Sequence, residues 1–206
     1  MPNTTPVVTD NLTVFAVQPL ARGSSLSTTL AWATKFGGWL MIRIGRQDTT
    51  ALGTGISVRI NRTFNANAVG HPASVAPLIG QTVAAAQTTV NSLSSSGQNL
   101  LNVASVTGFN AGDFITVKDG VGSYSRWEVG RVIKTAAGVL TLDRNLQFSH
   151  TSAQADKVTN AADIFPPIRV EGGCTLEVIL DYGAAGSGST TDAEVLAQSY
   201  DSDLFS

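Results

Sequence analysis

The most regular alternation of apolar and polar positions lies between Gly37 and Thr63. Two candidate strands cover residues 39–44 and 55–62. In the second segment apolar and polar side chains alternate: Ile56, Val58 and Ile60 are apolar, and Ser57, Arg59 and Asn61 are polar. This is the period of a half-buried strand. The linker GRQDTTALGTG is rich in turn-forming residues, so the pattern predicts a β-hairpin.

A hairpin of two strands is not stable alone and needs a second sheet over its apolar face. Segments 12–17 and 26–33 before the hairpin are candidate strands, and segments 174–182 and 193–200 lie far beyond it. The last of these could instead form a short helix. We expect these segments to supply the cover, with GAAGSGSTT (183–191) as a hairpin loop between the last two strands.

Residues 100–158 have a different pattern, with shorter candidate strands separated by frequent turn signals. The strands are expected at 114–118, 127–133 and 139–143, and Asp119-Gly120 is a strong tight-turn signal. This spacing is typical of a small barrel or sandwich. Before it, residues 83–90 could form a strand or a short helix, and the β-branched Thr88, Thr89 and Val90 favour a strand or an extended connection.

The pattern predicts an all-β protein: an antiparallel, jelly-roll-like β-sandwich with an inserted small β-barrel-like module. The sandwich would comprise residues 11–96 and 161–200, the module residues 97–160, with an arm at 1–10 and a tail at 201–206. The alternative is two β domains in tandem. That arrangement leaves the C-terminal strands without partners, so the insertion is favoured.

The composition argues against several classes of function. The 206 residues carry a formal net charge of −2, and Lys and Arg are scattered singly, so we expect no direct contact with nucleic acid. Cys174 is the one cysteine and lies in the apolar run CTLEVIL, which indicates a small core residue and no intrachain disulfide. We expect no secretory signal and no membrane span, and therefore a protein made in a cytoplasm.

Few side chains in the sequence suggest chemistry. His71 and His150 are the two histidines. A Ser-His-Asp triad needs an acid behind the base, and the sequence around His150 offers none, so we expect no catalytic residue. One cysteine and two distant histidines give no zinc spacing, and the loop 183–191 lacks the lysine of a phosphate loop. We therefore expect no metal, no cofactor and no enzymatic activity.

Two features of the sequence suggest surfaces that bind a sugar or a protein partner. Trp127 next to Arg126 is expected in the core, and a sugar-binding platform is the alternative. The chain ends are short and mostly polar, and such segments commonly become ordered on a neighbouring subunit. Frayed termini are the alternative. The candidate partner contacts in these ends are Pro2, Pro6, Val7, Val8, Leu204 and Phe205.

Three stretches carry a resemblance: FGGWLMIRIGRQDTTALGTGISVRI, then GFNAGDFITVKDG with RVIKTAAGVLTLDRNLQFSHT, then EGGCTLEVILDYG. Together they resemble small structural proteins encoded in the virion gene blocks of tailed bacteriophages, and the middle stretch is similar to β modules of capsid-decoration and tail-associated proteins. The resemblance implies a non-enzymatic virion component, assembled in the host cytoplasm.

The role favoured by this resemblance is capsid decoration, as a homo-oligomer, preferably a trimer, in contact with the major capsid protein or other virion proteins. A neck, collar or tail component is the alternative within the class. A carbohydrate-binding module for host attachment is the rival from another class, and a hydrolase is a third.

Overall fold

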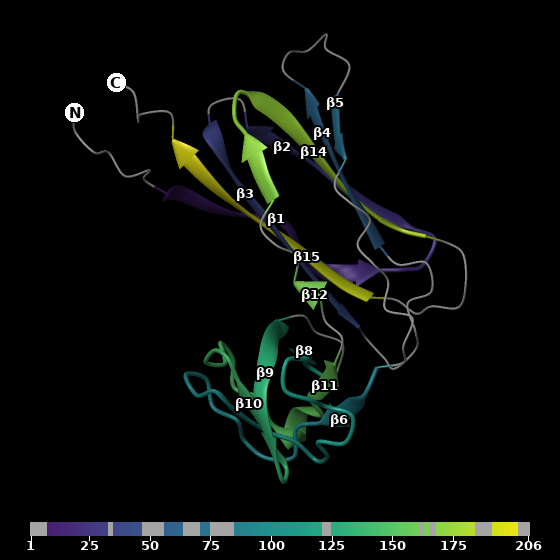
Figure 1. The fold of residues 1–206 in the computed structure, drawn as a ribbon, viewed down its shortest axis with the longest axis vertical. Helices are drawn as coiled ribbons and strands as arrows, with labels where there is room; N and C mark the ends of the chain where they lie inside the picture. The colour runs from purple at the N-terminus through teal and green to yellow at the C-terminus, as the bar shows by residue number, and fades with distance from the viewer. Residues whose placement is uncertain are drawn as a thin grey trace, which may run out of the picture.

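The computed structural model describes residues 8–32, 35–46, 56–63, 71–74, 85–120, 125–160, 163–164, 168–183 and 191–201. In this part of the chain nearly all regular structure is β, and the one helical element is a 3₁₀ turn, η1 (Ser152–Gln154). Figure 1 shows two packed sheets with a smaller β body at one end. The predicted all-β class is confirmed.

The two packed sheets form the sandwich. Sheet A has the order β1 (Val8–Leu20), β15 (Thr191–Asp201), β3 (Lys35–Arg46) and β12 (Asp163–Ile164), and β13 (Ile168–Glu171) also pairs with β3. Sheet B has the order β2 (Ser25–Trp32), β14 (Cys174–Tyr182), β4 (Ile56–Thr63) and β5 (His71–Ser74). All these pairs are antiparallel. This alternation of the chain between two sheets is the strand order of a jelly roll.

The core lies where the inner faces of the two sheets meet. Along β14 buried and half-buried positions alternate without interruption. Along β4 the buried Ile56, Val58 and Ile60 alternate with a half-buried and an exposed position. Cys174 is buried in this core as a small apolar residue, as expected. Each fully buried aliphatic side chain contributes about 1.5–3 kcal/mol of transfer free energy. Among those in this core are Leu40, Ile42, Val58, Leu176, Val178, Leu180 and Val195.

The predicted hairpin between residues 37 and 63 is wrong in its pairing. Both strands exist, but β3 pairs within sheet A and β4 within sheet B. The predicted hairpin at residues 183–191 fails in the same way, because β14 and β15 also lie in different sheets. Alternation identifies the buried face of a strand. It cannot tell whether two such faces lie side by side in one sheet or meet across a core.

The third sheet lies between β5 and β12 in chain order. Its order is β6 (Gln87–Thr89), β11 (Lys157–Asn160), β8 (Phe114–Lys118), β9 (Glu128–Ala136), β10 (Val139–Leu142) and β7 (Leu100–Asn102). The chain beyond β6 pairs with the chain beyond β7: Ala104 N donates to Thr89 O (2.9 Å) and Asn91 N to Asn102 O (3.2 Å). These bonds join the two edges of the sheet into a small barrel with its own apolar core.

The barrel packs against the outer face of sheet A. Trp127 and Val129 of the barrel form a small apolar cluster with Phe114 and with Val17 of β1. The barrel and sheet A come very close at Gly45 of β3, where a Cβ atom would overlap the Thr116 methyl group and lie 3.2 Å from the Trp127 ring. A glycine at this position lets the barrel backbone come close to β3.

Charged groups surround this contact. Lys118 Nζ lies 3.3 Å from Oδ2 of Asp192, which is fully buried. Arg43 pairs with Glu194 on sheet A and lies over the Trp127 ring, 5.6 Å from its centroid. Burial raises the pKa of Glu194, and the neighbouring Arg43 opposes that shift. The joint between sandwich and barrel therefore combines a tight apolar contact with partly buried ion pairs.

The Gly45 contact can be tested by adding and then removing one methyl group. Gly45→Ala is expected to lower the free energy of unfolding by about 1–3 kcal/mol because the new Cβ overpacks the joint. Thr116→Ser removes the overlapping methyl group, so the double variant should recover part of the loss. Urea unfolding of the two single variants and the double variant measures this. Equal losses in Gly45→Ala and the double variant would contradict the close approach.

Candidate functional site

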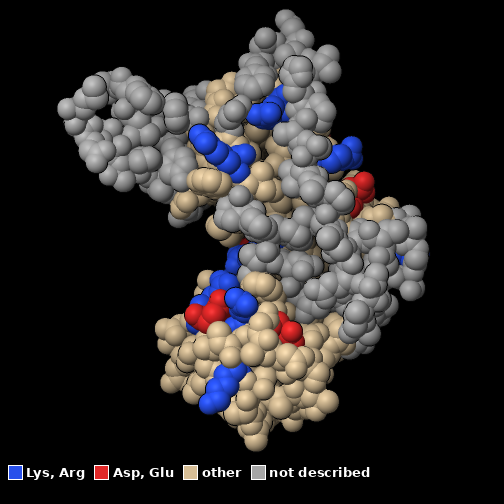
Figure 2. All heavy atoms as spheres, in the orientation of Figure 1, with Lys and Arg blue, Asp and Glu red and all other residues tan. Residues whose placement is uncertain are grey.

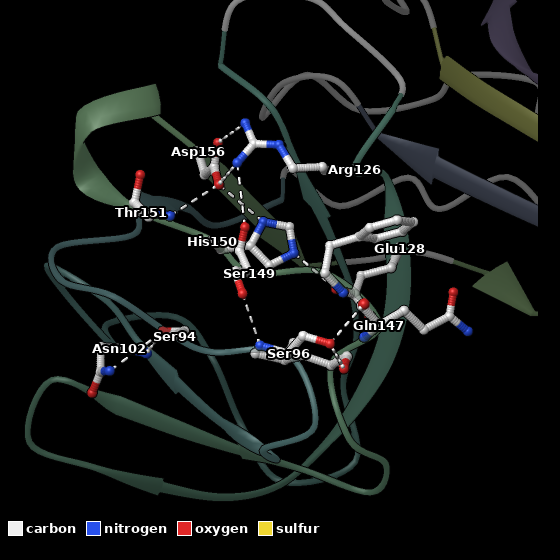
Figure 3. Close-up of polar contacts among 12 residues, drawn as sticks. Ser94, Ser96, Asn102, Arg126, Glu128, Gln147, Ser149, His150, Thr151 and Asp156 are labelled. Atoms are coloured by element: carbon white, nitrogen blue, oxygen red, sulfur yellow. Dashed lines mark hydrogen bonds and ion pairs between the residues drawn. The ribbon is translucent and has the colours of Figure 1, made fainter.

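The barrel contains a compact group of titratable side chains, the His150 cluster: Asp119, Arg126, Glu128, His150 and Asp156. Figure 3 shows most of its members converging on the His150 ring. Glu128 begins β9, Asp119 follows β8, and His150 and Asp156 lie on either side of η1. The imidazole and both flanking carboxyl groups are buried, and Arg126 is largely buried.

Each nitrogen of the His150 ring faces a carboxylate. Nδ1 lies 3.0 Å from Asp156 Oδ2, and Nε2 lies 2.8 Å from Glu128 Oε1. Arg126 contacts both oxygens of Asp156, Nη1 to Oδ2 at 3.3 Å and Nη2 to Oδ1 at 3.2 Å, and its Nη2 lies 2.7 Å from Asp119 Oδ2. Buried carboxylates need such partners, because an unpaired buried charge is strongly destabilising.

The same carboxylates also hold the backbone of the segment between β10 and β11. Glu128 accepts hydrogen bonds from the amides of Gln147 (2.9 Å) and Phe148 (3.3 Å). Asp156 accepts one from the Thr151 amide at 3.1 Å. The His150 cluster therefore ties residues 147–156, most of them outside regular strands, to the start of β9 (Figure 3).

The geometry of His150 fits a structural role better than that of a general base. A base needs a ring nitrogen directed at the proton to be removed. Here both nitrogens are directed at carboxylates, and both contacts are hydrogen bonds from His150 only when both nitrogens carry protons. The nearby hydroxyls of Ser149 and Ser94 accept hydrogen bonds from the backbone amides of Ser96 (3.0 Å) and Asn102 (2.9 Å).

The expectation that nothing near His150 could orient it is wrong, since two acidic residues do so. They lie 22 residues before and 6 residues after His150, and this spacing matches no sequence motif for a catalytic site. One signal was present: Glu128 stands inside the apolar run WEVGRVI. A carboxylate at such a position is usually buried and paired. Both ring contacts of His150 within the described part of the chain are to carboxylates, and neither is to a hydroxyl or thiol nucleophile.

The structure also locates the other residues that the sequence suggested for binding or catalysis. Trp127 is only 5% exposed and packs in the joint with sheet A, so the sugar-platform alternative at this residue is wrong and the core prediction is right. His71 begins β5 of sheet B, opposite Arg62 of β4, whereas His150 lies in the barrel between β10 and η1, outside the named strands. The part of loop 183–191 that covers residues 184–190 lies outside the described residues.

Of the six predicted partner contacts, only Val8 is in the described part of the chain. It begins β1 opposite Tyr200 of β15, so the last three residues of the predicted arm belong to a strand. Pro2, Pro6, Val7, Leu204 and Phe205 lie outside the described residues, and their roles stay predictions. Because β1 begins where β15 ends, both terminal segments join sheet A at the same end.

Among the described strands, β1 (13 residues) lies at the edge of sheet A and pairs with β15 along one side. Its register is interrupted between Val8 and Asp10 and at two points between Thr13 and Gln18. Irregularities of this kind are a common way to limit uncontrolled pairing at an exposed edge. The edge is therefore available for contacts over only parts of its length.

Two other kinds of site are absent from the described residues. No group of three or more His, Cys, Asp or Glu side chains there is arranged to hold a metal ion. No helix in this part of the chain is long and apolar enough to cross a membrane.

Comparisons with known proteins give weak likenesses. No protein-family model and no curated protein matches the chain. The Gp54 tailspike of Acinetobacter baumannii bacteriophage AP22, solved with a capsular saccharide, is 14% identical with a TM-score of 0.33, over 40% of this chain and 15% of the tailspike. VP17, a capsid protein of bacteriophage P23-77, is 11% identical with a TM-score of 0.20, over 96% of this chain and 100% of VP17.

The complex of VP16 and VP17, the two major capsid proteins of the same phage, gives 12% identity and a TM-score of 0.19, over 92% of this chain and 97% of the matched chain. TM-scores this low do not establish a shared fold. The chain spans only 15% of the tailspike that it matches.

The structural role of the His150 cluster predicts a large effect of removing one buried partner. Asp156→Ala leaves His150, Arg126 and the Thr151 amide without their shared acceptor, and should lower the free energy of unfolding by about 3–5 kcal/mol. Arg144→Ala removes only an exposed pair with Asp143, and should cost less than about 1 kcal/mol. Urea unfolding followed by tryptophan fluorescence compares them, and similar losses would contradict the role assigned to the cluster.

Proposed function

We propose that this protein is a non-enzymatic structural subunit of a tailed-bacteriophage particle. The observation that carries the proposal is the jelly-roll order of the two sheets, β1-β15-β3-β12 and β2-β14-β4-β5. Jelly rolls form viral capsid proteins, and they also occur in lectins and cupins. Fold alone does not decide between these. The sequence resemblance to virion structural proteins favours the first.

The His150 cluster supports a structural subunit over an enzyme. It contains the acid and base side chains that catalysis would require, but the ring nitrogens face carboxylates and the carboxylates hold backbone amides. These groups are buried in the barrel and hold the backbone of the segment between β10 and β11. A hydrolase built on His150 would need at least one of these contacts to open.

Within the particle, the preferred role is capsid decoration by a homo-oligomer, with a trimer favoured. Edge strand β1 and the two terminal segments provide contact elements at one end of sheet A. Contacts made by strand edges and extended segments add buried area without enlarging the folded core. The partners would be further copies of the chain and the major capsid protein. A neck, collar or tail component would use the same elements.

A carbohydrate-binding module is the second candidate, and one observation favours it. The outer face of sheet B carries a polar row in which Thr29, Glu177 and Asn61 are cross-strand neighbours, and Asn61 Nδ2 donates to Glu177 Oε2 at 2.7 Å. Polar groups of this kind could contact sugar hydroxyls. Glycan binding usually also needs exposed aromatic side chains, and Trp127 is buried.

Deleting the terminal segments tests the decoration role. Removal of residues 1–7 or of residues 202–206 is expected to abolish binding to capsids that lack this protein. Folding should be unchanged, because both deletions stop short of β1 and β15. Co-sedimentation with capsids measures binding, and circular dichroism measures folding.

A control variant distinguishes the two candidates. Thr29→Ala changes the polar row on sheet B and should leave capsid binding intact. Normal capsid binding by both deletion variants would contradict the role of the terminal segments. Loss of glycan binding in Thr29→Ala, on a glycan bound by the unmodified protein, would favour the carbohydrate-binding module.

A further inference from the structure

The outer face of sheet A carries an apolar strip between the barrel and the end of β15. Met41 of β3 lies opposite Leu196 of β15, which lies opposite Thr13 of β1. One row further from the barrel, Gln198, Trp39 and Arg169 are neighbours across β15, β3 and β13. Their chain neighbours Leu40, Ile42, Val195 and Ala197 face the sandwich core. We call this surface the outer strip.

The outer strip is apolar at its centre and partly open. Met41 is 38% exposed, and Leu196 and Trp39 are half-buried. On the barrel side the strip ends at the Arg43–Glu194 pair, which lies against Trp127. On the other side it ends where β15 does, with exposed Arg169 at its flank. The strip therefore has one exposed apolar side chain, Met41, beside half-buried apolar neighbours and a polar rim, and an open apolar surface with a polar rim is a candidate interaction site.

We propose that the outer strip binds the segment Asp203-Leu204-Phe205 of a second copy of this chain. Leu204 and Phe205 are the apolar side chains of an otherwise polar tail, and their chemistry matches Met41 and Leu196. Asp203 is complementary in charge to Arg169. This inference rests on the proposed function in one respect, that copies of the chain associate. It adds the acceptor surface for the tail.

The length of the tail explains why a second copy is needed. Leu196 lies five residues before Asp201, about 17 Å along the strand at ~3.3 Å per residue. Phe205 lies four residues beyond Asp201. To return over its own sheet the tail must first reverse, which takes at least about two residues. Phe205 of the same chain then reaches only the level of Tyr200, well short of Met41 and Leu196.

A tail that binds the outer strip of a neighbour makes a heterologous contact, because donor and acceptor surfaces differ. Such contacts form closed rings when the rotation between copies closes, and open filaments when it does not. The closed case corresponds to the cyclic oligomer of the proposed function. Each copy then gives one tail and receives one.

Disulfide trapping between two differently tagged full-length proteins tests the proposal. One protein carries Thr13→Cys, beside Leu196 on the outer strip. The other carries Ser206→Cys, next to Phe205. Both substitutions leave the apolar side chains in place. The native Cys174 is buried. The matched control is Thr29→Cys, which is also an exposed strand position and lies on the outer face of sheet B.

After mild oxidation of the mixture, we expect a mixed dimer from Thr13→Cys with Ser206→Cys, and at least about tenfold less from Thr29→Cys with Ser206→Cys, a ratio equivalent to ~1.4 kcal/mol. Adding Met41→Glu to the Thr13→Cys protein should remove the excess, and adding Met41→Leu should preserve it. Equal trapping at Thr13 and Thr29, or trapping unaffected by Met41→Glu, would overturn the proposal.

The result also separates this inference from the proposed function. If the unmodified protein binds capsids while Thr13 and Thr29 trap equally, the tail site is wrong and the structural role stands. If trapping at Thr13 is selective but capsids are not bound, the tail site stands and capsid decoration is wrong.

Discussion

Mutual burial of two apolar sheet faces is the constraint on which the rest of the structure depends. Neither sheet could be stable alone, since each presents a row of aliphatic side chains on one face. Packing those rows together leaves the other faces of β3, β15, β4 and β14 outside. The outer face of sheet A then supplies the platform for the barrel and the outer strip beside it. The outer face of sheet B supplies the polar row.

The barrel is stabilised differently, with an apolar core of its own and a buried ionic cluster at one side. Burying five titratable groups is costly unless each is paired, and here the pairs also hold the segment between β10 and β11 through its backbone amides. The glycine at position 45 brings this barrel against sheet A. Chemistry that resembles a catalytic site is thus used to hold a loop.

Much of the fold could be predicted from the alternation of apolar and polar residues. The strands at 56–63 and 174–182 were expected because their side chains alternate, and the β class follows from them. Their partners could not be predicted in this way. The alternation of a strand is the same whether the next strand along the chain lies beside it or in the opposite sheet. The pattern therefore predicts hairpins at two places where the chain crosses between sheets.

The site was harder to predict than the fold. His150 was recognised as a possible base, but Glu128 and Asp156 come from separate elements that only the closed barrel brings together. The tail residues Leu204 and Phe205 were selected as apolar positions in a polar end. The outer strip, which is proposed to receive them, has Met41 and Leu196 at its centre. These two residues are 155 positions apart in the chain (196 − 41) and become neighbours only through the register of β3 and β15.

The central claim is that this protein is a subunit that binds a phage shell at many equivalent sites. The most direct measurement is the number of copies bound per capsid at saturation, obtained by titrating purified full-length protein onto capsids that lack it and weighing the particles by mass spectrometry. The account predicts a sharp plateau at a copy number set by the symmetry of the shell. Absence of binding, or a single ring of copies at one vertex, would contradict capsid decoration.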